Sequence, residues 1–553
     1  MKLSHDRIRF SRRQFILSLT ALPMLGSSGC AILGLGKSPE IPSEAPSGLG
    51  EIFKPASVKK SVSAPPFVID VHAHFFNARD VPIKGYLAGP VAHSKGGVIG
   101  ELFRALGPIA EWIGNTAPRA SDEFNELVAL ASGATFTAMS HRERTSTLER
   151  ERDRYLQDLS GRLYEQLRSI PRSLRADQPD FVSLYNAAQA EARSRFGVRN
   201  LSAPALDEMS LYRAMQRDLQ QQASDIELFG AEEPPPYVDG VLAFVGYMLS
   251  YRWMNLLAYQ RAYSTSDSAF GVDQVLGALV DFDHWLMPLP RTAHEDQIKL
   301  HQLLSQLSGG YMRPLVAYNP WSDVLDNGKT LERTLDALDR HGFVGVKIYP
   351  PNGFRPYGNE PSPGIPSTPG MPSAVDLDRV LLRLWEACGK RNVPVMAHTG
   401  NSMGSDDAHS SAAGPVGWQA VINAMGSTHP ARVNLGHFGG DSSHDEWNAE
   451  LASMMATPQG AGLYGDLGYW DELRCQRGLA SCSAREKLAR AVKDHPVVRE
   501  RLMYGSDWLM LSQERRWDRY PFDLLAALPD GLNPISVFGD NARRCFDALQ
   551  KVA

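Results

Sequence analysis

The stretch that decides the fold is PPFVIDVHAHFF, residues 65–76, an apolar run with polar residues at alternate positions. This alternation predicts a β-strand that begins near Phe67. His72 and His74 stand two residues apart, so on a strand they project to the same side, about 7 Å apart at Cβ. Two imidazoles at this spacing can converge on one metal ion. Taken alone, the pair is a weak signal, because a histidine is more often a structural residue with satisfied hydrogen bonds.

Seven further apolar runs follow between residue 271 and the end of the chain, and each leads into polar residues. They are QVLGALVDFDHW (274–285), YMRPLVAYNP (311–320), FVGVKIYP (343–350), VPVMAHTG (393–400), RVNLGHFGG (432–440), AGLYGDLGYW (461–470) and RLMYGSDW (501–508). Helical segments separate most of these runs, at 294–307, 329–341, 375–391, 416–427, 444–456 and 484–495, and a last helix fits 534–551. Strands that alternate with helices predict βα units and a parallel sheet.

Together with the first strand, these runs make eight βα units, which predict a TIM barrel of typically ~250 residues. We expect the barrel to occupy residues 67–79 and 271–553. Residues 80–270 look mainly helical and would form a large insertion after the first strand. That insertion would lie on the side of the βα loops, where active sites form in this fold. We therefore expect it to be a lid or wall over the mouth of the barrel.

The first 30 residues look like an export signal. The motif SRRQFI, which begins at Ser11, looks like a twin-arginine signal, and the apolar run that follows is too short for the ~20 residues that span a bilayer. Cys30 stands where a bacterial lipoprotein is cleaved, so two readings stay open: lipidation of Cys30, which would tether the protein to a membrane, and ordinary cleavage nearby. Residues 31–66 are rich in Pro and Ser and predict a flexible linker. We expect an exported protein of the bacterial periplasm or outer cell envelope.

The composition excludes several classes of protein. Lys and Arg number 57 against 62 Asp and Glu, a net charge of −5, whereas a nucleic-acid-binding protein shows a basic surplus. A hydrophobic content of 43% and a charged content of 22% exclude wholesale disorder. Five cysteines in 553 residues are too few for a disulfide scaffold. A small molecule is the expected partner, and a homo-oligomer stays open.

Side chains that suit a metal stand at the carboxyl ends of four predicted strands. His72 and His74 end the first, His398 ends the fifth, His437 ends the sixth and Asp507 ends the eighth. In a TIM barrel these positions surround one cavity. Three or more imidazoles and a carboxylate suit one divalent transition metal, Zn²⁺ above all, with Mn²⁺ as the alternative. The joint placement carries this prediction, since none of the residues carries it alone.

These motifs resemble the amidohydrolase superfamily, specifically the amidohydrolase-related family that includes the aminocarboxymuconate-semialdehyde decarboxylase-like enzymes. The carrying motifs are DVHAH (70–74), GVKIYP (345–350), MAHTGN (396–401), NLGHFGG (434–440), YGSDW (504–508) and GDNARR (539–544). The resemblance covers the barrel, a little over half of the chain. It covers neither residues 80–270 nor the Pro-rich loop from 350 to 372, so the substrate and the partners stay open.

The resemblance implies a role for each of the five residues. His72, His74 and His398 would be metal ligands. Asp507 would be the strand-8 ligand that also takes a proton from metal-bound water, and His437 would polarise the substrate or shuttle protons. The chemistry agrees with these roles, because a bound divalent metal lowers the pKa of its water to about 7 and a neighbouring carboxylate can accept the proton.

Four further residues are candidates with two readings each. Lys347 ends the predicted fourth strand, where some superfamily members carry a carboxylated lysine that bridges two metals; the other reading is a lysine that lines the pocket of a single-metal site. His284, Tyr349 and Trp508 are candidate residues of the substrate pocket. The alternatives are an N-cap or structural hydrogen bond for His284 and an aromatic core for Tyr349 and Trp508.

We expect a metal-dependent hydrolase of a small ester, lactone or amide, because the complete His-x-His, His, His, Asp set is the hydrolytic one. Non-oxidative decarboxylation in the same architecture is the alternative, and a binding protein anchored in the envelope is the non-enzymatic one. Residues 400–404 (GNSMG) also fit the Gly-x-Ser-x-Gly elbow of serine hydrolases, with Ser402 as nucleophile. That elbow must lead into a helix, and the residues that follow are poor helix formers, so we expect no serine nucleophile.

Overall fold

The computed structural model describes much of the chain from residue 64 onward. The described residues are 49, 51–55, 60, 64–95, 104, 107, 110, 111, 113–133, 136, 138–168, 241–265, 270–284, 292–360, 371–426, 430–440, 447–474, 483–514 and 516–549. The expected signal at 1–30, with Cys30, lies outside these residues, as does most of the expected linker at 31–66. Both stay predictions.

Eight parallel strands form the centre of the fold, and all eight lie within the predicted runs. They are β1 (Ile69–Ala73), β2 (Gln274–Ala278), β3 (Met312–Ala317), β4 (Gly345–Ile348), β5 (Val395–His398), β6 (Val433–Gly436), β7 (Leu463–Asp466) and β8 (Leu502–Met503). Each strand pairs in parallel with the next one along the chain. The ring closes where the Val71 amide donates to Tyr504 O at 3.1 Å and the Asp507 amide donates to His72 O at 2.6 Å. The predicted TIM barrel is confirmed.

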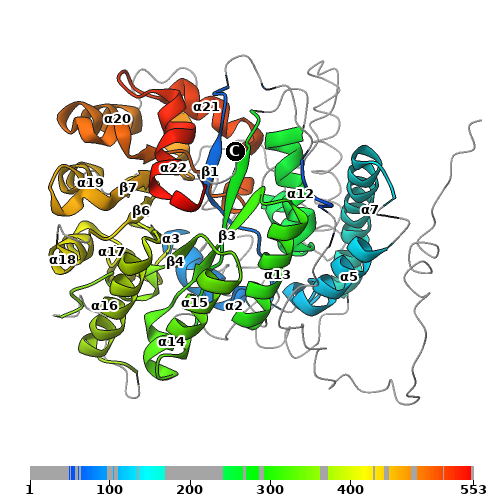
Figure 1. The fold of residues 1–553 in the computed structure, drawn as a ribbon. Helices are drawn as coiled ribbons and strands as arrows, with labels where there is room; N and C mark the ends of the chain where they lie inside the picture. The colour runs from blue at the N-terminus through cyan, green and yellow to red at the C-terminus, as the bar shows by residue number, and fades with distance from the viewer. Residues whose placement is uncertain are drawn as a thin grey trace, which may run out of the picture.

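Helices follow the strands and surround them (Figure 1). They are α13 (His294–Leu307), α14 (Pro320–Leu325), α15 (Lys329–Arg340), α16 (Ala374–Arg391), α17 (Asp407–Ser411), α18 (Pro415–Met425), α19 (Trp447–Met455), α20 (Ser483–Asp494), α21 (Tyr520–Ala527) and α22 (Asn541–Cys545). Their ends follow local chemistry: α16 begins with a capping box between Ser373 and Asp376 and ends at Asn392, which adopts a left-handed conformation. The single helix predicted at 534–551 is instead a π turn, α22 and a short 3₁₀ turn.

Buried apolar side chains close one end of the barrel and leave the other to polar groups. Inside the ring, one cluster joins residues from several strands with α22 and the turn after it: Ile69, Val71, Leu276, Ala278, Leu315, Val344, Met396, Met503, Ala542, Cys545, Phe546 and Leu549. Ile69 begins β1 and Val344 precedes β4, so α22 seals the amino ends of the strands. A larger cluster fills the space between the strands and the outer helices.

The described residues between β1 and β2 are largely helical. Their helices are α2 (Ile83–Tyr86), α3 (Ala92–Lys95), α5 (Ala120–Ser132), α7 (His141–Arg168), α11 (Val241–Met248) and α12 (Arg252–Gln260). Helix α5 packs against α13, and α7 packs against α12, at one side of the barrel (Figure 1). Residues 169–240 lie outside the description, so the division of the chain into a barrel and an insertion that acts as a lid stays a prediction.

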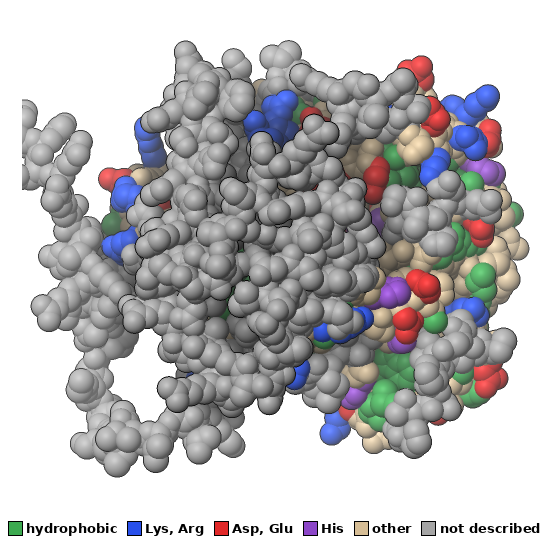
Figure 2. All heavy atoms as spheres, turned by 180° about the vertical axis from the view of Figure 1, so that it is seen from behind, with side chains coloured by type: hydrophobic (Ala, Val, Ile, Leu, Met, Phe, Trp, Pro, Cys, Tyr) green, Lys and Arg blue, Asp and Glu red, His purple; other side chains and the backbone are tan. Residues whose placement is uncertain are grey.

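Two further features concern the charged side chains on one face and the length and hydropathy of the helices. On the face seen in Figure 2, acidic and basic side chains of the described residues are interspersed, as the small net charge of −5 suggests. Among the helices that the structure describes, none is both long and apolar enough to cross a membrane.

A buried ion triad ties the helices between β1 and β2 to the barrel. Arg252, at the start of α12, is fully buried, with its guanidinium nitrogens 2.6 Å from Asp80 Oδ1 and 2.9 Å from Glu123 Oε2. Asp80 lies shortly after β1, and Glu123 lies on α5. Since a buried charge is tolerated only when it is paired, the three residues depend on one another.

Replacing Arg252 by Met should lower the free energy of unfolding by about 3–5 kcal/mol, because Asp80 and Glu123 would stay buried without their cation. Arg333→Met is the matched control. The Arg333–Glu295 pair (3.0 Å) is partly exposed, and such pairs contribute about 0–1 kcal/mol. Urea unfolding followed by circular dichroism measures both variants. Equal effects of the two substitutions would contradict the structural role of Arg252.

Candidate metal centre

The five residues singled out as a set lie together at the carboxyl ends of the strands. His72 lies in β1 and His74 just after it, His398 ends β5, His437 follows β6 and Asp507 lies shortly after β8. All five are at most 8% exposed. The closure of the ring brings the first and the eighth strand side by side, so residues more than 400 positions apart in sequence meet at one end of the barrel.

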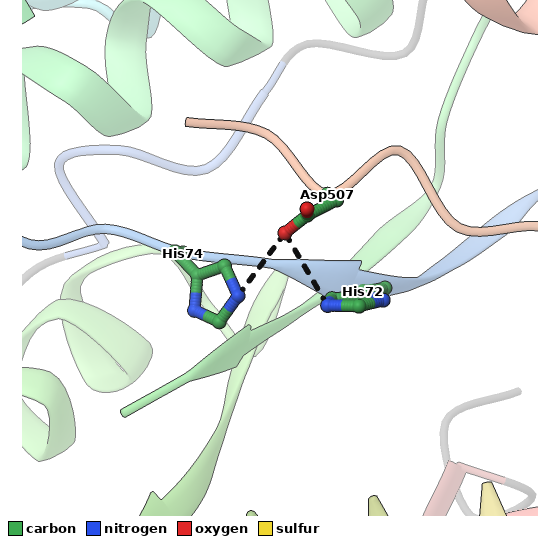
Figure 3. A group of neighbouring side chains, drawn as sticks. All are labelled: His72, His74 and Asp507. Atoms are coloured by element: carbon green, nitrogen blue, oxygen red, sulfur yellow. Dashed lines mark ion pairs between the residues drawn. The ribbon is translucent and has the colours of Figure 1, made fainter. Parts of the chain in front are cut away.

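His72, His74 and Asp507 form the tightest part of this group. Oδ1 of Asp507 lies 3.3 Å from Nε2 of His72 and 3.2 Å from Nε2 of His74, so both imidazoles point at one carboxylate oxygen (Figure 3). One ligand atom from each residue lies within 4.8 Å of the others, which is close enough for all three to bind one ion. Two imidazoles and a carboxylate are a donor set that Zn²⁺ accepts.

Hydrogen bonds fix which nitrogen of each imidazole is free. Nδ1 of His74 lies 2.8 Å from Ala278 O, and Nδ1 of His437 lies 2.6 Å from Gly468 O. A carbonyl oxygen only accepts, so in both residues Nδ1 carries a proton and Nε2 is the nitrogen left to face the candidate centre. Nδ1 of His72 lies 3.2 Å from Asp466 Oδ1 in the same manner. This arrangement fits a bound metal, whose histidine ligands usually donate their second N–H to a protein acceptor.

His398 and His437 lie next to the group of three. The His398 and His437 rings have centroids 4.6 Å apart, and the His437 and His72 rings have centroids 4.9 Å apart. Tyr349 packs its ring 5.2 Å from that of His398.

The Gly-x-Ser-x-Gly motif at residues 400–404 does not form a strand-to-helix elbow. Nε2 of His398 lies 3.3 Å from Ser402 Oγ, but the next helix, α17, begins only at Asp407.

The electrostatics favour ligands that are ready for a cation. Burial lowers the pKa of His72 to about 4, against Asp466 and Asp507, which act to raise it. Burial also holds the pKa of His398 well below its usual range, and the neighbouring His437 adds to this effect. Burial raises the pKa of Asp507, but His72 and His74 lower it further, to below its usual range. At neutral pH His72 and His398 are therefore neutral and the Asp507 carboxylate is ionised, as metal ligation requires.

Lys347 lies in β4 with 2% of its surface exposed. Burial lowers the pKa of its amine to about 8, although Asp507 and Asp466 act to raise it. The amine therefore lies within the electrostatic reach of the candidate centre. A lysine that loses its proton this readily suits either a bridge between two metals or a single-metal pocket, so both readings stay open.

The three predicted pocket residues have different surroundings. Tyr349 is half-buried against His398 and Phe282. Trp508 is fully buried among the rings of Phe75, Tyr247, Tyr259 and Trp517, which is the aromatic-core environment. His284 is exposed in a turn after β2, and no contact among the described residues joins it to the histidines.

Sequence reasoning missed Asp466 as a site residue. It ends β7, is fully buried and accepts hydrogen bonds from His72 and from the backbone of His437. A signal existed, because Asp466 is a carboxylate at the carboxyl end of a predicted strand, like Asp507. Asp466 contacts Nδ1 of His72 and the backbone amide of His437. These contacts join distant segments of the chain, so only the structure shows that Asp466 belongs to the site.

A second group that could hold a cation lies at the start of α13. Nε2 of His294 is 3.2 Å from Asp281 Oδ2 and 3.3 Å from Asp283 Oδ2. Burial lowers the pKa of His294, but Asp281 and Asp283 raise it to about 10 overall. At neutral pH His294 is therefore protonated and pairs with both carboxylates as an ion triad.

The stability of the protein should depend on pH through His294. Its pKa rises from about 6.5 in the unfolded chain to about 10 in the fold, so its contribution is complete below about pH 6.5 and is lost as the pH rises through 10. The difference in unfolding free energy between wild type and His294→Gln should therefore shrink by at least about 1 kcal/mol, roughly one pKa unit, between pH 7 and pH 10. A difference that does not change with pH would contradict the triad.

Comparison with known proteins found one similar family. A family model described as amidohydrolase matches residues 312–548, which run from β3 to the 3₁₀ turn after α22. The match includes Lys347, His398, His437 and Asp507, whereas His72 and His74 lie before it. A comparison with curated proteins found no match.

Solved structures with a similar barrel include three from bacteria. An uncharacterised TIM-barrel protein from Bordetella bronchiseptica is 14% identical, with 61% of this chain and 93% of that chain covered and a TM-score of 0.36. 2,6-Dihydroxybenzoate decarboxylase from Rhizobium is 17% identical (50% and 84% covered, TM-score 0.32). A zinc-bound amidohydrolase from Burkholderia multivorans is 14% identical (50% and 84% covered, TM-score 0.32). Residues 312–548 of this chain, somewhat less than half of its length, are therefore similar to the family described as amidohydrolase.

Proposed function

We propose that the protein is a metal-dependent hydrolase of a small ester, lactone or amide. The observation that carries the proposal is the convergence of Nε2 of His72 and Nε2 of His74 on one oxygen of Asp507, at 3.3 and 3.2 Å. His398 and His437 complete the set of residues around this point. The family match over residues 312–548 supports the same class of enzyme.

Each residue would act through the atom that the hydrogen bonds leave free. His72, His74, His398 and Asp507 would hold one divalent metal, with Zn²⁺ as the favoured ion and Mn²⁺ as the alternative. A metal held there would supply the acidity that lets a water molecule lose its proton near neutral pH. Asp507, which is ionised and lies at the centre of the group, would accept that proton. His437 has its proton on Nδ1 and a free Nε2, which can hold or pass on a proton at the substrate.

Decarboxylation is the second candidate reaction, because the enzymes that the sequence motifs resemble include decarboxylases of the same architecture. A hydrolase directs a nucleophile at a carbonyl carbon, whereas a decarboxylase must deliver a proton to carbon. In the described site, an ionised Asp507 beside the neutral imidazole of His72 favours the removal of a proton from water over the donation of a proton to carbon. This favours hydrolysis.

The metal content of the full-length protein, purified without a chelator and measured by elemental mass spectrometry, should be about one divalent ion per chain. About two ions would make Lys347 a bridging ligand. Lys347→Met should leave a single-metal site loaded and should halve the content of a two-metal site. No metal after reloading with Zn²⁺ or Mn²⁺ would contradict the proposal.

His437→Asn should lower kcat by about 10²–10⁴-fold at unchanged metal content, because it removes a proton-transfer group and no ligand. The assay is a panel of lactones, esters and amides beside carboxylated aromatic compounds, with product analysis. His341→Asn is the matched control. His341 ends α15 beside Asp336 and Gln302, away from the candidate centre, so this substitution should leave kcat unchanged.

The panel also separates the alternatives. Carbon dioxide as the only product would identify a decarboxylase. Loss of activity in Ser402→Ala with the metal retained would favour a serine nucleophile. Ligand binding without turnover, unchanged in His437→Asn, would indicate a binding protein.

A further inference from the structure

Asp466 binds four N–H donors from three strands or the segments that follow them. Its Oδ1 accepts from Nδ1 of His72 at 3.2 Å, from the His437 amide at 3.1 Å and from the Gly468 amide at 2.8 Å. Its Oδ2 accepts from Nδ2 of Asn434 at 2.8 Å. The side chain is fully buried, so direct protein donors satisfy this carboxylate. It therefore connects β1, β6 and β7 at the end of the barrel that holds the candidate centre.

The first consequence concerns the proton of His72. Oδ1 of Asp466 already accepts two backbone N–H groups, which can only donate, so this oxygen acts as an acceptor toward the imidazole as well. Nδ1 of His72 therefore carries the proton. Nε2, on the other side of the ring, faces Asp507 at 3.3 Å.

The second consequence concerns the turn that presents His437. His437 and Phe438 have φ values of 66° and 47°, in the left-handed region that non-glycine residues seldom adopt. The His437 amide donates to Asp466, and Nδ1 of His437 donates to Gly468 O at 2.6 Å. The Gly468 amide donates back to Asp466. One carboxylate thus holds the backbone of His437 and also the segment that orients its ring.

Three glycines, Gly436, Gly468 and Gly505, lie directly against the His72–Asp466 pair, where a larger residue would collide with it. A Cβ atom on Gly468 would lie 2.7 Å from His72 Nδ1 and 2.9 Å from Asp466 Oδ1. A Cβ atom on Gly505 would lie 2.8 Å from His72 Cβ, and one on Gly436 would lie 3.1 Å from His72 Cε1. Three segments of the barrel therefore come close enough around the pair to prevent the imidazole from turning.

We propose that Asp466 is a positioning residue, which fixes the tautomer and orientation of His72 as a metal ligand and holds the turn that presents His437. This inference rests on the proposed function, since it concerns the metal centre of that function. The competing role is a carboxylate that stabilises the fold alone. The two roles differ in one measurable respect, because a purely structural carboxylate would change the unfolding free energy and leave metal affinity as it is.

Asp466→Asn is the informative variant, because the amide oxygen can still accept from the backbone while the negative charge behind His72 is lost. The dissociation constant for Zn²⁺, measured on the full-length protein by competition with a chromophoric chelator, should rise by about 10–100-fold. The visible spectrum of the Co²⁺-loaded variant should change as well. Asp323→Asn is the matched control: Asp323 is buried and accepts from the Leu331 amide and Tyr318 OH, so the variant should bind Zn²⁺ as wild type does.

Wild-type affinity in Asp466→Asn, or an equal loss in Asp323→Asn, would overturn the inference. If Asp466→Asn does not fold, ¹⁵N nuclear magnetic resonance of the Zn²⁺-loaded wild-type protein, labelled at histidine, still decides the matter. The His72 signal, assigned by its loss in His72→Asn, should show Nδ1 protonated, and a proton on Nε2 would overturn the inference. Neither measurement uses a substrate. If the Zn²⁺ affinity and the His72 signal behave as expected but the protein hydrolyses nothing in the panel, the proposed hydrolase activity is wrong and the positioning role of Asp466 still holds.

Discussion

The closure of the barrel between β1 and the segment after β8 is the constraint on which the rest of the site depends. The Asp507 amide donates to His72 O, and the Val71 amide donates to Tyr504 O. These backbone contacts join the ring and also set the Asp507 side chain against the imidazoles of His72 and His74. Without this closure the carboxylate and the two histidines would lie at opposite edges of an open sheet. The fold and the candidate centre are therefore two results of one set of hydrogen bonds.

The two ends of the barrel have different roles: the amino ends of the strands are packed with apolar side chains, and the carboxyl ends carry the polar residues of the candidate centre. Apolar residues of α22 and of the segment after it, among them Phe546 and Leu549, pack into the amino ends as part of the interior cluster. The carboxyl ends carry the polar residues, whose N–H groups are directed outward to fixed acceptors such as Ala278 O and Gly468 O. Because those acceptors belong to the barrel backbone, the free nitrogens are oriented before any ligand arrives, which is the preorganisation that metal sites and catalysis need.

The sequence was informative where a local pattern repeats. Alternating apolar runs and helical segments identified all eight strands and the barrel class, because each βα unit carries its own signal. The rule that polar residues at strand ends meet at one face placed His72, His74, His398, His437 and Asp507 together. Trp508 shows the limit of the same reasoning, since its aromatic neighbours come from α11, α12 and a turn before α21, which no local pattern connects to it.

Contacts between distant segments account for what the sequence did not predict. Asp466 looks like any strand-end carboxylate until its four donors are known, and these come from positions 72, 434, 437 and 468. The triad of Arg252 joins residues 80 and 123 in the same way. The last predicted helix ends early, at Cys545, because Phe546 leaves the helical conformation and packs with Leu549 into the interior cluster, a tertiary contact that outweighs local helix propensity.

Anomalous X-ray diffraction at the zinc edge, from crystals of the full-length protein loaded with Zn²⁺, tests the central claim most directly. We predict a peak at about 2.0–2.2 Å from Nε2 of His72, Nε2 of His74 and a carboxylate oxygen of Asp507. A sole peak between Asp281, Asp283 and His294, or the absence of any peak at the carboxyl ends of the strands, would contradict it.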